Sequence, residues 1–219
     1  ASALATLARI QHELGHEEDA KAALARAYDA AVAAGDVAPS VPSTSPEELA
    51  KRRLASHKVF VWRQIGRVER DLGRLPEAES AFRRALAMSE RIDGRGNFNQ
   101  PAMQVEVGDV LRAGGAWSAA EGAYVSALSS LDKTAGGTAQ DMPAALDGLA
   151  RVKWAKGERV EAEAAVRREI GLYEAYISSD HPQLAPALEL LAAILSASGN
   201  DVEAKTALAR AAAIRKMKL

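Results

Sequence analysis

Two histidines and a glutamate near the N-terminus have the spacing of a zinc site. Residues 12–16 read HELGH, and the pattern H-E-x-x-H places two zinc-binding histidines one helical turn apart, with a glutamate that activates water. Such a site needs a third protein ligand. The extended motif would require glycine and histidine where Asp19 and Ala22 stand, and the next glutamate after Glu18 is Glu47. A zinc metallohydrolase is therefore only a remote alternative.

Other chemical motifs are missing from the sequence. The glycine-rich stretches TAGGTAQD and GRGNF lack the lysine-serine/threonine ending of a phosphate-binding loop, and no G-x-S-x-G nucleophile motif occurs. The chain contains no cysteine, which excludes disulfides and thiolate metal sites. We therefore predict that the protein is not an enzyme and has no catalytic residue, no cofactor and no resident metal.

Composition and charge narrow the class of protein. The net charge of −1 argues against a general affinity for nucleic acid. No apolar run approaches the roughly 18 residues that span a bilayer, which predicts a soluble chain without a membrane span, with the cytoplasm favoured. The N-terminus has neither an initiator methionine nor a signal-peptide pattern, which favours a processed or excised segment. Richness in alanine, leucine, arginine and glutamate is typical of helices.

A period of 42 residues runs through most of the chain. Four glycines, Gly73, Gly115, Gly157 and Gly199, recur at this spacing. When each is numbered position 15 of its repeat, position 20 is always alanine, position 24 is large and apolar, and position 8 is small. Gly15 belongs to an earlier copy of the pattern. The pattern indicates stacked repeats, each a helix, a turn at the glycine and a second helix.

An insertion separates the first copy from the second. Gly15 lies 58 residues before Gly73, and residues 36–45 between them are rich in proline and serine. We interpret 36–45 as a linker. The helix before Gly73 is expected to begin near Pro46, either as one long helix or as an extra helix joined to it. In this register His12 ends one helix and His16 lies in the turn.

The second repeat carries Trp62, Ile65, Gly66, Ala78 and Phe82 at the spacing W-x2-L-G followed by A-x3-F. This pattern resembles the tetratricopeptide repeat, and the last repeat looks like the long-period repeats of kinesin light chains and their bacterial relatives. The resemblance implies an all-α, right-handed solenoid of about five helix pairs in one domain, 1–219. The repeats are expected at roughly 1–34, 59–92, 101–134, 143–176 and 185–218.

Two carboxylates depart from the pattern of that family. Glu69 stands where the family prefers tyrosine, and Glu169 stands at a position that is usually small. Trp62 and Trp117 are expected to pack in the core.

One side of the first helix in each repeat is expected to face away from the core. At 100° per residue, positions 4, 7, 8 and 11 carry the apolar and small side chains, and positions 2, 5, 9, 12 and 13 lie opposite. The family resemblance implies that this opposite side lines a concave groove for peptide ligands. The candidate partner-binding residues on it are Arg9, Phe60, Arg63, Arg67, Arg70, Asp109, Arg112, Asp147, Arg151 and Trp154.

The candidate residues favour a protein partner with an acidic segment. Arginine offers a planar fork of donors for carboxylates, and tryptophan offers an anchoring surface. A simpler alternative is pairing within the chain, of Arg67 with Asp109, or of Arg151 with Asp147 or Asp109. A further alternative is a regulatory or sensor domain that acts in cis within a larger protein. Self-association through the terminal repeats is another way to cover their apolar faces.

Overall fold

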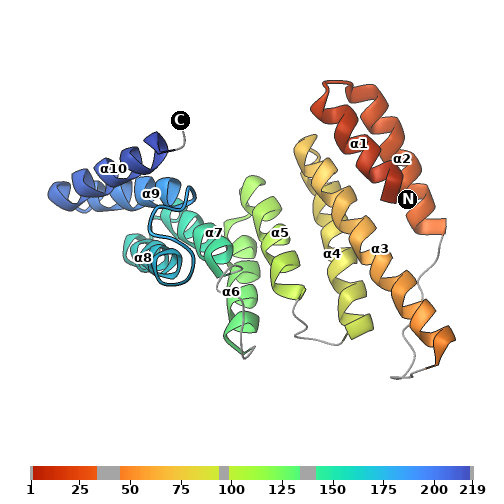
Figure 1. The fold of residues 1–219 in the computed structure, drawn as a ribbon. Coiled ribbons are helices and arrows are strands. Elements are labelled where there is room, and N and C mark those ends of the chain that lie inside the picture. Colours follow the sequence, from red (N-terminus) through yellow and green to blue (C-terminus); the bar gives the residue numbers. More distant parts are fainter. Residues whose placement is uncertain (1, 34–44, 94–98, 134–141, 218–219) are drawn as a thin grey trace. The chain divides into compact units, whose positions relative to one another are not determined.

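Helices alone make up the described part of the chain. The computed structural model describes residues 2–33, 45–93, 99–133 and 142–217, and every regular element in these ranges is an α-helix (Figure 1). In chain order they are α1 (Ser2–Glu13), α2 (Glu17–Ala33), α3 (Pro46–Asp71), α4 (Leu75–Asp93), α5 (Gln100–Ala113), α6 (Trp117–Lys133), α7 (Met142–Ala155), α8 (Arg159–Tyr176), α9 (Leu184–Ala197) and α10 (Asp201–Lys216). The all-α prediction is confirmed, and none of these helices is long and apolar enough to cross a membrane.

The region before the second turn glycine forms one long helix. α3 begins at Pro46 and continues without a break to Asp71, so the first of the two predicted arrangements is correct. The predicted linker, residues 36–45, lies outside the described residues except for Ser45.

The helices group into two compact bodies, which we call the N-terminal body (Ala1–Gly114) and the C-terminal body (Gly115–Leu219). In the N-terminal body α1 packs on α2, α3 packs on α1, α2 and α4, and α4 also packs on α5. In the C-terminal body α7 packs on α8 and α9 on α10, while α6 packs on α7 and α8 on α9. Within each body, contacts therefore run between helices that are close in the chain, as in a solenoid.

The turn glycines end the first helix of every repeat. Their φ angles lie between 75° and 81°, a left-handed conformation that glycine adopts without steric strain. In the first, second, fourth and fifth repeats the residue after the glycine donates its backbone N–H to the carbonyl five residues earlier, for example from Arg74 to Glu69 at 2.8 Å and from Glu158 to Lys153 at 2.9 Å. These bonds form Schellman caps, which satisfy carbonyls that the helix end would leave unpaired.

Small and large side chains alternate in the core as the repeat pattern predicts. The alanines at position 20 are at most 2% exposed. Trp62 is buried at 4% exposure, which confirms its predicted place in the core. The same prediction for Trp117 is wrong, because this side chain is 40% exposed. Trp117 is the first residue of α6, directly after the turn, and so lies at the end of the helix rather than along its packed length.

Two glycines allow an aromatic ring to lie against a helix backbone. A Cβ on Gly66 would lie 2.8 Å from the Phe82 ring, and a Cβ on Gly148 would lie 2.2 Å from the ring of Tyr124. Both rings are fully buried. Because protein interiors are close-packed, even one added methyl group at these positions forces the ring or the helix to move.

We predict that Gly148→Ala destabilises the C-terminal body by about 1–3 kcal/mol, because the new methyl group overlaps the Tyr124 ring. Gly122→Ala is the matched control, since no atom lies within 4 Å of a Cβ there and the helix gains propensity, which stabilises it by roughly 0.5–1 kcal/mol. Urea denaturation followed by circular dichroism measures both. Equal effects of the two substitutions would show that the Tyr124 contact does not constrain packing.

Candidate functional site

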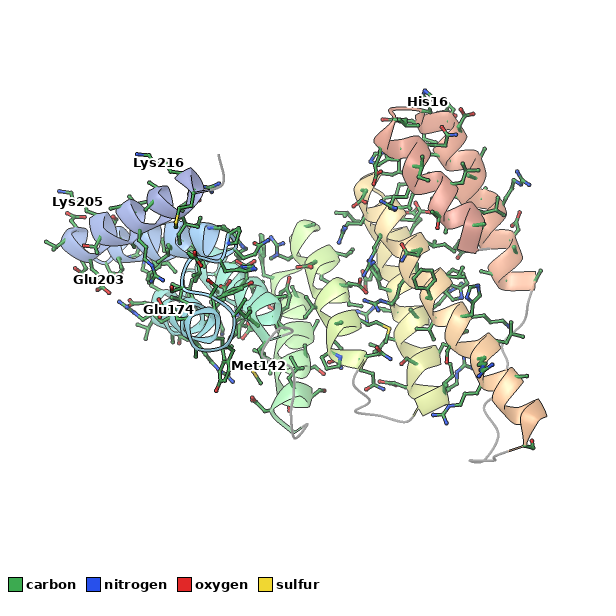
Figure 2. The ribbon with its side chains drawn as sticks, in the orientation of Figure 1. His16, Met142, Glu174, Glu203, Lys205 and Lys216 are labelled. Atoms are coloured by element: carbon green, nitrogen blue, oxygen red, sulfur yellow. The ribbon has the colours of Figure 1, made fainter. Side chains whose placement is uncertain are left out.

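The segment HELGH does not lie on one helix. α1 ends at Glu13, and α2 begins at Glu17, so His12 belongs to the first helix and His16 to the turn. His16 lies at the connection between α1 and α2 (Figure 2), with its Nδ1 2.8 Å from Oε1 of Gln11. Two histidines on one helical face are what the zinc motif requires. The described residues also contain no group of three side chains that could hold a metal ion.

A buried carboxylate joins two of the predicted arginines in the N-terminal body. Arg63 and Arg67 of α3 both donate to Glu106 of α5, which is 8% exposed. The Arg63 Nε lies 2.8 Å from Oε2, and the Arg67 Nε and Nη2 lie 2.8 and 2.6 Å from Oε1. Charge-assisted bonds of this kind to a buried carboxylate fix both guanidinium planes. We call these three residues the arginine cluster.

The arginine cluster keeps donors for a ligand. The hydrogen bonds to Glu106 use Nε and Nη2 of each guanidinium, so the Nη1 groups lie outside the Glu106 network. The Arg63 and Arg67 side chains are 23% and 39% exposed, and two positive charges against one negative leave a net charge of +1. Phe60 lies on the same helix, is 46% exposed and stacks on His57 at 6.3 Å between ring centroids.

The remaining predicted arginines of the N-terminal body pair with acids near them in sequence. Arg9 lies 2.6 Å from Glu13, one turn along α1. Arg70 lies 3.0 Å from Asp71. The ion pair between Arg112 and Asp109 on α5 has a length of 3.6 Å. Ion pairs this exposed contribute little stability, and each of them is neutral overall.

In the C-terminal body Arg151 and Asp147 form one ion pair on α7. The Arg151 Nε lies 2.8 Å from both Asp147 carboxylate oxygens, and this hydrogen bonding raises the pKa of the guanidinium. The simpler interpretation of the sequence, in which these two residues pair with each other, is therefore correct. Trp154, one turn further along α7, is partly exposed.

Glu169 lies behind this ion pair, in the body's interior. It is 3% exposed, and its Oε2 atom is buried without a hydrogen-bond partner. Burial raises the pKa of Glu169 to about 8, the negative charge of Asp147 contributes to the rise, and Arg151 opposes both. The carboxyl is therefore mostly protonated at neutral pH. Glu169 stands at position 27, which is alanine in all four of the remaining repeats, and those alanines are at most 1% exposed.

Glu69 is the corresponding departure in the N-terminal body. It is 5% exposed, and burial raises the pKa of its carboxyl, while the positive charge of Arg74 opposes the shift. The Arg74 Nε lies 3.2 Å from Oε2 of Glu69 in an ion pair. Both carboxylates that depart from the repeat pattern are thus buried groups with raised pKa values.

The structure brings some predicted residues together and leaves others with local partners. Arg63 and Arg67 meet at one carboxylate, but the predicted pairing of Arg67 with Asp109 is replaced by pairing with Glu106. Sequence reasoning missed Glu106 because position 6 is not on the predicted outer side. Its offsets of 43 and 39 residues from the two arginines, close to the 42-residue period, were the available signal.

These features define a class of protein, the all-α repeat solenoid. Its units are helical hairpins, each of which turns at a glycine in the left-handed conformation. The sequence profile of the tetratricopeptide repeat family matches residues 59–133 and 141–217, more than half of the chain. The chain belongs to the tetratricopeptide repeat family, as its sequence pattern predicts.

Solved structures of similar fold cover nearly the whole chain. BtubC (BKLC) from P. vanneervenii has a TM-score of 0.70 at 16% identity, over 98% of this chain and 79% of that one. A Podosopora anserina putative kinesin light chain with nearly identical TPR-like repeats has a TM-score of 0.67 at 20% identity, over 99% and 95%. MamA has a TM-score of 0.63 at 14% identity, over 97% and 96%. A search of curated proteins finds no match. At these identities the likeness shows the fold.

We predict that Glu169 makes the C-terminal body less stable as the pH rises. The folded-state pKa of about 8 exceeds the ordinary value of 4.5, so the folded chain holds a proton that the unfolded chain has lost. Stability is therefore greatest below about pH 4.5 for this group and falls by roughly 2–4 kcal/mol as the pH approaches 8. Glu169→Gln, which stays neutral, should remove that slope.

The measurement is urea denaturation between pH 5 and 8 for the native chain and for Glu169→Gln, and the difference between the two curves isolates this carboxyl. Glu163→Gln on the same helix serves as control, because Glu163 is more exposed and pairs with Arg167 at 2.8 Å. Parallel curves for the native chain and Glu169→Gln would contradict the raised pKa.

Proposed function

We propose that this chain is a non-catalytic scaffold that binds an acidic segment of another protein along the first helices of its repeats. Tetratricopeptide repeats generally mediate protein–protein interaction, so a protein partner follows from the family. The observation that carries the acidic preference is the arginine cluster, two arginines held by one buried carboxylate beside the exposed ring of Phe60.

The chemistry of the cluster supports a carboxylate ligand. A guanidinium presents five N–H donors in one plane, and Glu106 uses those on Nε and Nη2 of each arginine. A ligand carboxylate binds at the Nη1 groups, where the net charge of +1 attracts it. Phe60 supplies an apolar contact for a neighbouring side chain of the ligand.

Arg9, Arg70, Asp109 and Arg112 extend this proposed surface in the N-terminal body, and Asp147, Arg151 and Trp154 form its counterpart in the C-terminal body. Their ion pairs make them polar but nearly neutral. These nearly neutral pairs are better suited to hydrogen bonds with a partner's polar backbone and side chains than to binding further carboxylates.

We also propose self-association through the terminal repeats as a second way in which the chain binds a protein. The supporting observation is exposed apolar surface on the first and last helices, including Leu7, Ile10 and Leu208 at 41%, 42% and 49% exposure. Surface of this kind favours a protein contact over solvent.

Peptide binding tests the acidic preference with variants that differ only at the arginine cluster. Glu106→Gln removes the internal competing carboxylate and raises the cluster's charge from +1 to +2, so acidic peptides selected from a display library should bind several-fold more tightly. The triple variant Arg63→Gln, Arg67→Gln, Glu106→Gln has a cluster charge of zero and should lose binding. Fluorescence polarisation measures the affinities.

The control variant is Arg83→Gln with Arg167→Gln, which removes two exposed arginines from second helices and should leave affinity unchanged. Circular dichroism checks that each variant keeps its helicity. If the triple variant binds the peptides as well as Glu106→Gln does, the arginine cluster is not the binding site.

A further inference from the structure

One arginine of the N-terminal body lies over two aromatic rings instead of pairing with an acid. The guanidinium carbon of Arg84 on α4 lies 4.9 Å from the centroid of the Trp62 ring and 5.6 Å from that of the Tyr28 ring. Within the described ranges, no group accepts a hydrogen bond from Arg84 or forms an ion pair with it. Stacking uses the face of the guanidinium, whereas its N–H donors lie in the plane of the group. These donors therefore stay available to a ligand.

The repeat pattern shows which partner Arg84 lacks. Arg84 stands at position 26, and two ion pairs of the C-terminal body join an arginine at this position to an acid at position 32 of the preceding repeat, namely Arg168 with Asp132 at 3.1 Å and Arg210 with Glu174 of α8 (Figure 2). The second, third and fourth repeats carry an acid at position 32, whereas the first repeat carries Val32, which is 51% exposed. The position that would supply a carboxylate to Arg84 is therefore apolar.

Val32 and Arg84 line the same pocket. It has a volume of about 280 Å³, lies between α2, α3 and α4, and is lined by Ala31, Val32, Trp62, Arg84, Met88 and Arg91. We call it the α2–α4 pocket. Trp62 and Met88 are each 4% exposed and form its apolar part. Pockets for drug-sized ligands measure roughly 300–1,000 Å³, so the α2–α4 pocket is suited to one or two side chains of a protein.

A pocket of the C-terminal body shows the same arrangement with its charges paired. It lies between α8, α9 and α10, has a volume of about 340 Å³ and is also lined by positions 4, 26 and 32. All four charged residues of its lining are joined in ion pairs, namely Arg167 with Glu203 and Arg210 with Glu174. None of the described residues that line the α2–α4 pocket is acidic. The α2–α4 pocket is thus the one of the two whose lining supplies positive charge without a matching acid.

We propose that the α2–α4 pocket binds an acidic side chain of a partner protein, with its carboxylate on the N–H donors of Arg84 and an adjacent apolar side chain of the partner against Val32 and Met88. The partner's carboxylate takes the role that the acid at position 32 has in the C-terminal body. Bonds between a guanidinium and a carboxylate are charge-assisted and directional, which favours this ligand over a neutral one. The site lies apart from the arginine cluster of α3 and α5 and goes beyond the function proposed for that cluster.

Titration of the full chain with two tripeptides tests the proposal. The probe is acetyl-Leu-Glu-Leu-amide, and its neutral match is acetyl-Leu-Gln-Leu-amide. The titrated chain carries Arg63→Gln, Arg67→Gln and Glu106→Gln, so that the arginine cluster has no net charge and does not attract the probe. Two-dimensional NMR of the backbone and indole N–H groups measures affinity and locates the site. The Glu peptide should shift the indole signal of Trp62 and bind about tenfold more tightly than the Gln peptide, because a charged hydrogen bond is stronger than a neutral one.

Substitutions at positions 32 and 26 separate this pocket from the rest of the surface. Val32→Glu supplies the acid that the C-terminal body has at position 32, so it should pair with Arg84 and abolish binding of the Glu peptide. Val32→Gln is the matched control, since it has the size of glutamate without the charge and should keep binding. Arg84→Gln should lose binding, while Arg210→Gln in the pocket of the C-terminal body should leave the affinity unchanged. Circular dichroism checks that each variant keeps its helicity.

Equal affinity for the two peptides, or equal binding by Val32→Glu and Val32→Gln, overturns the proposal. Binding that appears only after Asp36→Asn would mean that a carboxylate of the chain itself occupies the pocket, and this result overturns the assignment to a partner. The affinity of the arginine cluster for its own peptides is measured in a separate experiment, so failure at one site is distinguished from failure at the other.

Discussion

No helix of this chain can cover its own apolar side, and the structure depends on this constraint. The position-10 side chains of α3, α5, α7 and α9 are 0–2% exposed, and each of these helices packs on a helix of the repeat before it. Stability is therefore shared between neighbours, which is the physical basis of repeat proteins.

The small residues determine how closely neighbouring helices approach. Gly66 and Gly148 leave room for the rings of Phe82 and Tyr124, and the rings in turn fill space that would otherwise be empty. Because this packing is tight, a carboxylate that stands in place of one of the small side chains is enclosed by its neighbours. Glu169 occupies an alanine position in this way, and the raised pKa of its carboxyl is a consequence of the packing around it.

The polar side of the first helices is organised by ion pairs. Most of the predicted arginines are neutralised by an acid within four residues, which leaves them as polar surface. The arginine cluster differs because its carboxylate comes from another helix and is shared by two guanidinium groups. Because two guanidinium groups share one carboxylate, one positive charge stays uncompensated there. This excess charge distinguishes Arg63 and Arg67 from the other arginines.

The sequence by itself determined the helical class, the repeat and the position of each turn, because these follow from local chemistry. A glycine in register, with small and large residues at fixed spacing, decides where a hairpin turns, and this same register separates His12 from His16. Burial of Trp62 also followed from the pattern, whereas Trp117 did not obey it, since a helix's first residue has fewer neighbours than its middle.

Only the tertiary structure decided which charges meet. Glu106 and the two arginines come from helices about one period apart. Because long side chains reach across a full helical turn, the 42-residue period does not decide whether Glu106 or Asp109 pairs with the arginines. The raised pKa of Glu169 likewise depends on what surrounds it. Spacing in the sequence determines the path of the backbone, but burial and side-chain reach depend on three-dimensional neighbours.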